Sequence, residues 1–317
     1  MTTYQAERFL PQQLASILEQ TRLPDEVVVY DDASTDATWE ILADTAGTAP
    51  VPVRLHRQLA NVGLRRNVES ALATCTGDVV VLADQDDVWH PDKLATAADA
   101  FDDDTVRLWF SDAELVDADG ASLSRRAWQA AHVDLAELGW RRLLHGQTVT
   151  GATMAVSAEV VRLALPLPPE LDGPDHLYLH DGWLALLAAC TGAVVADERC
   201  LTSYRQHDGQ VTAMEMARMP APASRDGLGD APRQQALRQE AARVALVLDR
   251  LSARDAVVTA DVRAGLHDLT RYYRVRTGAD DAGPRRLQIL RELARGGYHR
   301  NARGFRTAAR DLARGSG

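Results

Sequence analysis

The sequence predicts an α/β fold, in which a mostly parallel sheet carries helices on both faces. Apolar runs rich in valine alternate with amphipathic helical segments over residues 1–100, as expected for repeated strand–helix units. A cluster of carboxylates directly follows one of these runs, and ligands of open α/β sheets bind beyond the carboxyl ends of the strands. An arginine-rich helical end adds a C-terminal helical extension to this fold.

The first part of the chain alternates helices with strands. Leu10, Leu14 and Ile17 recur at helical spacing, whereas residues 26–30 form an apolar, β-branched run typical of a strand. In chain order we expect a helix at 5–20, a strand at 26–30, a helix after 36, a strand at 51–56, a helix at 64–74 and a strand at 78–83. Because strand, loop and helix repeat in this order, we expect consecutive strands to run parallel.

The second part of the chain mixes short strands with helices. We expect strands at 108–111, 114–116, 151–156, 192–196 and 200–204, and helices at 128–144, 159–163 and 180–189. Residues 213–232 contain three Met, three Pro and several small residues, a composition typical of a flexible linker. Helices are expected at 231–253, 259–276 and 284–313. The predicted organisation is therefore a domain at 1–212, a linker at 213–232 and a basic helical region at 233–317.

Charge is distributed unevenly along the chain, whose formal net charge is -10. Residues 233–317 contain 18 Arg against 9 acidic residues, whereas residues 1–232 contain 17 basic and 36 acidic ones. The acidic balance argues against nucleic acid as the main partner. The sequence shows neither a run of about 18 apolar residues nor a signal-peptide pattern, so we expect a cytoplasmic protein.

Asp84, Asp86 and Asp87 directly follow the apolar run 79–83. Like charges this close together repel one another unless a cation compensates them. A hard divalent cation that carries a phosphate ligand suits oxygen donors of this kind. We therefore expect Asp86 to bind a metal, and Asp84 to face a ribose or to share the metal. The alternative is a solvated turn before the helix at Pro91.

Three further polar groups follow predicted strands or open a predicted helix. Asp31 and Asp32 can accept hydrogen bonds from a nucleobase or a ribose, or they cap the next helix. Asp181 begins a helix, where a carboxylate suits a general base or serves as an N-cap. Arg205 can neutralise a phosphate and His207 can ligate a divalent metal, although a lone histidine is more often structural.

Taken in order, six segments resemble the family 2 glycosyltransferases, and most strongly their bacterial rhamnosyltransferase-like members. The resemblance covers residues 2–210 and implies the GT-A fold, which has a Rossmann-like mixed, mostly parallel sheet. Members of the family begin with an apolar strand before the Thr-Tyr segment, whereas this chain starts at Met1, so we expect that first strand to be missing. The matching segments are Thr3-Tyr4-Gln5-Ala6-Glu7-Arg8-Phe9-Leu10, Asp31-Asp32-Ala33-Ser34-Thr35-Asp36, Asn61-Val62-Gly63, Asp84-Gln85-Asp86-Asp87-Val88-Trp89, His180-Asp181-Gly182-Trp183 and Tyr204-Arg205-Gln206-His207.

The resemblance also implies a role for each site residue. A divalent cation, Mg²⁺ or Mn²⁺, would be held on the donor diphosphate by the Asp-x-Asp pair of Asp84 and Asp86. The implied residues are Asp181 as catalytic base, Thr3, Tyr4, Asp31 and Asp84 for the nucleotide, Asp86 and His207 for the metal, Arg205 for the diphosphate, and Gly151, Ala152 and Thr153 for the acceptor side.

The implied activity is an inverting, metal-dependent transfer of a sugar from a nucleoside-diphosphate sugar to a hydroxyl of a cell-surface polysaccharide or a lipid-linked precursor. One candidate donor is dTDP-rhamnose, and the alternatives are a UDP-hexose or UDP-galactofuranose. A non-catalytic sugar-nucleotide or glycan-binding protein is the rival from another class. The basic C-terminal helices favour a peripheral position at the anionic inner face of the plasma membrane, although ordinary helix packing with exposed arginines explains them equally well.

Overall fold

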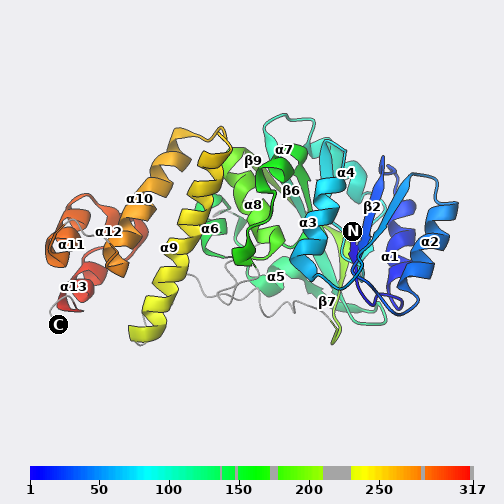
Figure 1. The fold of residues 1–317 in the computed structure, drawn as a ribbon, viewed down its shortest axis with the longest axis horizontal. Coiled ribbons are helices and arrows are strands. Elements are labelled where there is room, and N and C mark those ends of the chain that lie inside the picture. Colours follow the sequence, from blue (N-terminus) through cyan, green and yellow to red (C-terminus); the bar gives the residue numbers. More distant parts are fainter. Residues whose placement is uncertain (136–137, 147–148, 172–177, 210–229, 280–282, 315–317) are drawn as a thin grey trace. The chain divides into compact units, whose positions relative to one another are not determined.

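The computed structural model describes residues 1–135, 138–146, 149–171, 178–209, 230–279 and 283–314 (Figure 1). The chain divides into two compact units, Met1–Arg218 and Met219–Gly317, and each is described by itself. Most of the linker expected at 213–232 lies outside the described residues, and its last residues belong to the helix that begins at Asp230.

The first sheet of the N-terminal unit is parallel, has the order β1–β2–β3 and carries helices on both faces (Figure 1). Side chains alternate along β2, as the pleat of a strand requires. Val27 and Val29 pack in one core with Leu10 of α1, whereas the Tyr30 hydroxyl lies 2.9 Å from Thr74 Oγ1 of α3. The bounds are β1 Thr2–Thr3, α1 Leu10–Leu18, β2 Val27–Asp31, α2 Thr38–Thr48, β3 Val53–Arg57 and α3 Leu64–Thr74.

A short first strand is present where the sequence led us to expect none. Thr2 and Thr3 pair in parallel with Tyr30 and Asp31 of β2. The amino group of Met1 donates a hydrogen bond to the Val28 carbonyl at 2.8 Å. This pairing brings the Thr-Tyr segment beside the aspartates that follow β2, so two of the motifs found in the sequence meet at one edge of the sheet.

The second sheet is mixed and has the order β4–β8–β6–β9–β5, with β7 paired to β6. Only β6 and β9 run parallel among its described pairs. The strand before the acidic cluster was expected to be parallel, but β4 pairs antiparallel with β8, a partner so far along the chain that the local repeat of strand and helix does not determine its direction. The bounds are β4 Val79–Val81, β5 Val88–Trp89, β6 Val106–Val116, β7 Ser122–Arg126, β8 Met154–Ser157 and β9 Ala193–Arg205.

Helices and short turns cover this second sheet, and α4 and α8 pack against β6. The single helix expected at 128–144 is two helices, because His132 adopts a left-handed conformation with φ 53° and ends the first of them. The strands expected on either side of Asp112 join into β6, and the last two expected strands join into β9. The bounds are α4 Lys93–Ala100, α5 Ala127–Ala131, α6 Trp140–His145, η2 Gly151–Thr153, α7 Ala158–Ala164, η3 Pro169–Leu171 and α8 His180–Thr191.

The C-terminal unit is helical, as the sequence predicted. The helix expected at 284–313 is divided into three, because Gly296 and Gly304 adopt positive φ angles of 78° and 54°. In the part of the chain that the structure describes, no helix has the length and apolar character needed to span a bilayer. The bounds are α9 Asp230–Ala253, α10 Ala260–Thr277, α11 Arg285–Ala294, α12 Gly297–Asn301 and α13 Phe305–Arg314.

Candidate functional site

The N-terminal unit contains a cavity of about 300 Å³ at the carboxyl ends of β1, β2 and β4. Segments far apart in the sequence contribute to its wall, including the loop after β4 and the start of α8. Its lining residues are Thr2, Thr3, Tyr4, Asp32, Asn61, Gly63, Leu64, Asn67, Asp84, Gln85, Asp86, Thr150, Gly151, Leu179, His180, Asp181, Tyr204 and Gly209. The structure thus brings together six of the predicted site residues: Thr3, Tyr4, Asp84, Asp86, Gly151 and Asp181.

Four carboxylates, those of Asp32, Asp84, Asp86 and Asp181, line this one cavity. Burial, followed by the negative charges of Asp86 and Asp181, raises the pKa of Asp84 to about 7. Burial and the charges of Asp84 and Asp86 also raise the pKa of Asp87 well above its usual range. The site therefore concentrates more negative charge than its surroundings neutralise, and it is suited to a bound cation.

Asp86 and His207 are the two predicted metal ligands, and they meet in the structure. His207 Nε2 lies 2.9 Å from Asp86 Oδ2, and both side chains are largely buried. The Phe9 ring lies against the imidazole, with 4.7 Å between ring centroids. Within the described residues no group of three or more His, Cys, Asp or Glu side chains is arranged to hold a metal. A cation here would therefore take its remaining ligands from a bound diphosphate and water.

Asp181 lies in the first turn of α8 and joins that helix to the turn η2. Its Oδ1 accepts a hydrogen bond from the Gly182 amide at 2.7 Å, and its Oδ2 accepts one from the Gly151 amide at 3.0 Å. The side chain is only 4% exposed yet lines the cavity. Of the three residues expected on the acceptor side, Gly151 lines the cavity, whereas Ala152 and Thr153 are buried behind it.

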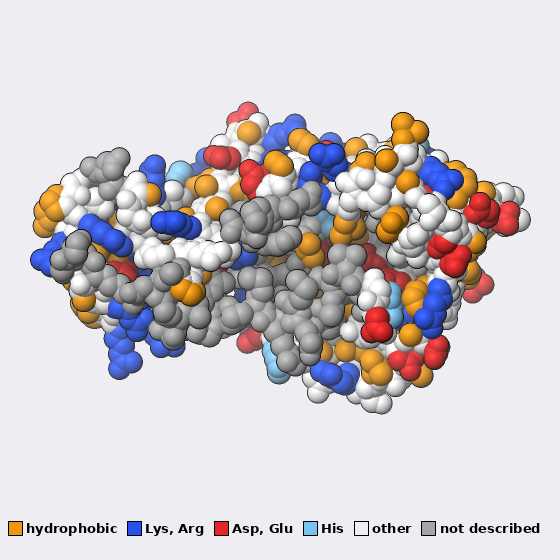
Figure 2. All heavy atoms as spheres, turned by 60° about the horizontal axis from the view of Figure 1, so that its bottom comes forward, with side chains coloured by type: hydrophobic (Ala, Val, Ile, Leu, Met, Phe, Trp, Pro, Cys, Tyr) orange, Lys and Arg blue, Asp and Glu red, His pale blue; other side chains and the backbone are white. Residues whose placement is uncertain are grey.

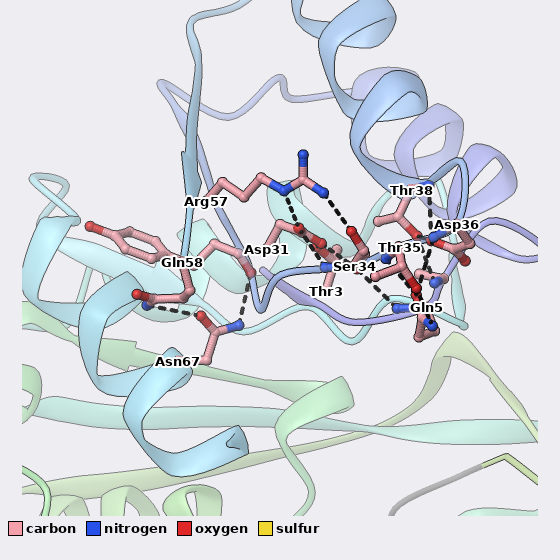
Figure 3. A network of polar contacts seen from close by, with 12 residues as sticks. Thr3, Gln5, Asp31, Ser34, Thr35, Asp36, Thr38, Arg57, Gln58 and Asn67 are labelled. Atoms are coloured by element: carbon pink, nitrogen blue, oxygen red, sulfur yellow. Dashed lines mark hydrogen bonds and ion pairs between the residues drawn. The ribbon is translucent and has the colours of Figure 1, made fainter. Parts of the chain in front are cut away.

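Asp31 does not line the cavity, contrary to its expected nucleotide contact, and it belongs instead to a network of polar contacts (Figure 3). Its fully buried carboxylate accepts hydrogen bonds from Thr3 Oγ1 at 3.1 Å and from the Ser34 amide at 3.0 Å, and it pairs with Arg57 at 3.4 Å. The neighbouring Asp32 lines the cavity instead. Asp31 is the last residue of β2 and Asp32 is the first residue after it, so the two adjacent aspartates divide their roles between the internal hydrogen bonds and the cavity.

Asp32 also holds the Asn61-Val62-Gly63 segment in place. Its two carboxylate oxygens accept the backbone amides of Val62 at 2.7 Å and Gly63 at 3.0 Å. Gly63 has a φ of 86°, a conformation that favours glycine, and α3 begins directly after it. The two motifs therefore form one wall of the cavity through backbone hydrogen bonds.

Arg205 is also placed differently from the expectation that it contacts the diphosphate. It is 2% exposed and is absent from the cavity lining. Its Nε donates to the Asp86 carbonyl at 2.7 Å, its Nη2 donates to Gln12 Oε1 at 2.7 Å, and its backbone amide donates to Asp87 Oδ1 at 3.0 Å. Arg205 thus holds the acidic loop 84–87 against the end of β9, and His207 follows two residues later in the chain.

Four other residues shape the site, and the sequence analysis gave none of them a role, although Gln85 and Tyr204 lie in the matching segments. Asn67 and Tyr204 line the cavity. The Gln85 side chain accepts a hydrogen bond from the Tyr4 amide at 2.7 Å and donates one to the Tyr4 carbonyl at 3.2 Å. Lys93 is buried below the acidic loop. One signal was available in the sequence: Lys93 is the only lysine of the chain.

Comparison with known proteins adds an independent finding. Residues 1–130 match the family model described as Glycosyl transferase family 2. An uncharacterized glycosyltransferase of Nostoc sp. is 25% identical over 209 residues, which are 65% of this chain and 63% of that protein. The dTDP-rhamnosyl transferase RfbG of Shigella flexneri is 29% identical over 107 residues, which are 31% of this chain and 36% of that protein.

The fold is similar to that of a solved structure with a bound nucleotide sugar. The structure of S. aureus TarS 1–349 in complex with UDP-GlcNAc aligns with a TM-score of 0.54 and 16% identity, covering 99% of this chain and 90% of that one. This likeness supports the α/β, GT-A architecture. By sequence, this chain spans less than two thirds of the length of the Nostoc protein, since the match covers 63% of that protein.

Proposed function

Because residues 1–130 match the model of glycosyl transferase family 2, we propose that the chain is a member of this family and transfers a sugar from a nucleoside-diphosphate sugar to an acceptor hydroxyl. One observation carries this proposal: Asp84, Asp86 and Asp181, from separate segments, converge on one cavity at the strand ends. A cavity with convergent acidic groups at this edge of an α/β sheet is the expected place for a nucleotide-linked substrate.

Asp86 and His207 are the proposed ligands of Mg²⁺ or Mn²⁺. A carboxylate oxygen and an imidazole nitrogen 2.9 Å apart form a donor set suited to such an ion. When bound, the ion would stabilise the negative charge of the diphosphate leaving group. Thr3, Tyr4, Asp32 and Asp84 line the part of the cavity proposed for the nucleotide.

Asp181 is the proposed catalytic base. A single displacement at the sugar carbon needs one carboxylate to take the proton of the acceptor hydroxyl, and it inverts the anomeric configuration. The Gly151 and Gly182 amides orient the two oxygens of Asp181, which leaves lone pairs of the same carboxylate for the acceptor proton. Gly151 lies next to this base on the proposed acceptor side, and because glycine has no side chain, its backbone itself lines the cavity there.

The donor and acceptor are proposed on weaker similarity. The likeness of 107 residues to RfbG, named a dTDP-rhamnosyl transferase, supports dTDP-rhamnose as the donor. The TarS complex with UDP-GlcNAc supports the alternative of a UDP-hexose. A hydroxyl of a growing cell-surface polysaccharide, or of its lipid-linked precursor, is the proposed acceptor.

A thermal-shift screen of nucleotide sugars with Mn²⁺ or Mg²⁺ tests the donor, because a bound ligand stabilises the fold by mass action. Asp181→Asn should then lower the transfer rate by about 10²–10⁴-fold and leave nucleotide binding intact. Asp261→Asn is the matched control, since Asp261 lies exposed in the first turn of α10. Wild-type transfer by Asp181→Asn would refute the base assignment, and binding without turnover would favour a non-catalytic binding protein.

The exposed face of α11 supports a peripheral position at an anionic membrane. Leu287 and Leu290 are 49% and 48% exposed, and the exposed Arg286 and Arg291 share their face of the helix. Figure 2 shows basic side chains on the surface of the C-terminal helices. Apolar side chains flanked by arginines suit the interface of an anionic membrane.

Vesicle sedimentation tests this membrane proposal. The protein should sediment with vesicles containing phosphatidylglycerol and less with pure phosphatidylcholine, and Leu287→Ser with Leu290→Ser should weaken the binding. The matched control is Leu59→Ser, since Leu59 is a fully exposed leucine of the N-terminal unit. Sedimentation that does not depend on anionic lipid would contradict the proposal.

A further inference from the structure

Lys93 is the only lysine among the 317 residues, and it is completely buried in the first turn of α4. Its Nζ donates to the Ala152 carbonyl at 2.6 Å and to Thr202 Oγ1 at 2.9 Å. The same nitrogen lies 4.2 Å from the centre of the Trp89 ring. A buried ammonium group with two acceptors and an aromatic face is a built site rather than a chance position.

These two acceptors belong to the segments that carry the proposed chemistry. Ala152 lies in η2 directly after Gly151, whose amide donates to Asp181. Thr202 lies on β9, the strand that leads to Arg205 and His207. Lys93 therefore fixes the backbone behind the acceptor side relative to the strand that supports the metal side.

The ammonium group also interacts electrostatically with Asp84 and Asp87 of the acidic loop. Asp87 is completely buried, and its Oδ2 has no hydrogen-bond partner among the residues that the structure describes. A buried carboxyl oxygen in this state is costly unless a positive charge lies nearby or the group takes up a proton. Burial lowers the pKa of Lys93 to about 7, and the charges of Asp87 and Asp84 act in the opposite direction. Lys93 is thus the counter-charge below the loop.

The geometry points to Lys93 as a positioning residue for sugar transfer, which balances the acidic loop from below and holds the Ala152 carbonyl of the acceptor side. This inference rests on the proposed function. A compact ammonium group suits the position, because a guanidinium needs more space and presents its donors in a flat fork. The role explains why lysine occurs here in a chain whose other basic residues are all arginine.

The variant Lys93→Met distinguishes this role from ordinary packing. The positioning role predicts that the variant binds Mn²⁺ more tightly but transfers sugar more slowly. Removal of a positive charge near the proposed metal site should tighten Mn²⁺ binding by about fivefold. Loss of the bond to Ala152 should lower kcat by roughly tenfold or more, with little change in the KM of the donor. Mn²⁺ binding is measured without nucleotide, by calorimetry, and the thermal midpoint is measured in EDTA.

Two further variants provide controls. Asp87→Asn added to Lys93→Met should recover part of the lost thermal midpoint, since removing both charges leaves neither one uncompensated. Arg243→Met removes another buried cation, one that pairs with Glu240 in the C-terminal unit, and it should leave Mn²⁺ affinity unchanged. If Lys93→Met weakens Mn²⁺ binding, or keeps wild-type kcat, the inference is wrong.

A measurement on the wild-type chain keeps the inference testable even if Lys93→Met does not fold. Selective ¹⁵N-lysine labelling yields one Nζ signal, which should shift when Mg²⁺ alone is added. An unchanged signal would overturn the inference. Because the probe is the metal alone, this result is independent of the donor. Failure of every nucleotide sugar to be turned over would instead refute the proposed function.

Discussion

Two groups of acidic residues, one in each unit, differ in their partners. In the C-terminal unit, the Asp268 carboxylate accepts hydrogen bonds from Arg300 and Asn301, and Asp311 accepts them from Arg233, Arg276 and Tyr298. In the acidic loop of the N-terminal unit, Asp84, Asp86 and Asp87 lie together, and burial raises the pKa values of Asp84 and Asp87. Paired acids stabilise a fold, whereas acids left in excess around a cavity indicate a site for a cation or ligand.

The pKa shifts of these two regions have opposite directions and therefore opposite effects on stability. The hydrogen bond from Arg300 lowers the pKa of Asp268, so its stabilising effect is present above the ordinary pKa and is lost as the pH falls. The raised pKa of Asp84 means that the folded state holds a proton that the unfolded state has released. Stability therefore falls as the pH rises between the two values.

The largest expected effect is on a paired acid. Asp311→Asn removes the carboxylate charge that pairs with Arg233 and Arg276, both almost fully buried, so the free energy of unfolding should fall by about 3–5 kcal/mol. Hydrogen exchange of peptides from α10 and α13 measures the loss. The control is Asp249→Asn, since Asp249 is exposed on α9. Unchanged protection would mean that the pairing does not stabilise the unit.

The next effect is on catalysis rather than stability. Asp86→Asn should lower the transfer rate by at least about 100-fold and weaken Mn²⁺ binding, because it removes a proposed ligand. Rates measured over a series of Mn²⁺ concentrations test both effects. Asp119→Asn, at an exposed carboxylate, is the comparison variant. If Asp86→Asn transfers sugar at the wild-type rate, the acids around the cavity do not differ in function from the paired acids that only stabilise the fold.

A smaller effect concerns the titration of the acidic loop. In EDTA, Asp84→Asn should raise the thermal midpoint by roughly 2–4 °C at pH 8 and have little effect near pH 4. The reason is that ionised Asp84 destabilises the folded state only as the pH rises toward its raised pKa of about 7. Scanning calorimetry at several pH values measures the difference. A difference that stays constant with pH would argue against the unbalanced charge.

The smallest effect is expected at an exposed ion pair. Arg199 pairs with Asp197 at 2.6 Å, and its side chain is 62% exposed. Arg199→Ala should change the free energy of unfolding by less than about 1 kcal/mol in urea titrations. A larger loss would show that ion pairs stabilise this protein even at its surface. The strong effect of pairing would then not be limited to buried acids such as Asp311.

The local pattern of the sequence predicted much of the fold. Periodicity identified α1, α3, α8 and β2, because the apolar positions of a helix or strand are set by neighbours a few residues away. It also identified the segments around the cavity, including Asp84, Asp86 and Asp181. It did not identify the antiparallel pairing of β4 with β8, because this partner lies far along the chain.

The sequence by itself determined the α/β class, the arginine-rich helical end and the segments that supply the acidic residues. Only the tertiary structure decided that Asp32 rather than Asp31 lines the cavity, that Arg205 is buried against the acidic loop, and that Lys93 lies below it. The physical reason is that residue type and spacing control local conformation. The direction of a side chain depends on hydrogen bonds and charges contributed by distant segments.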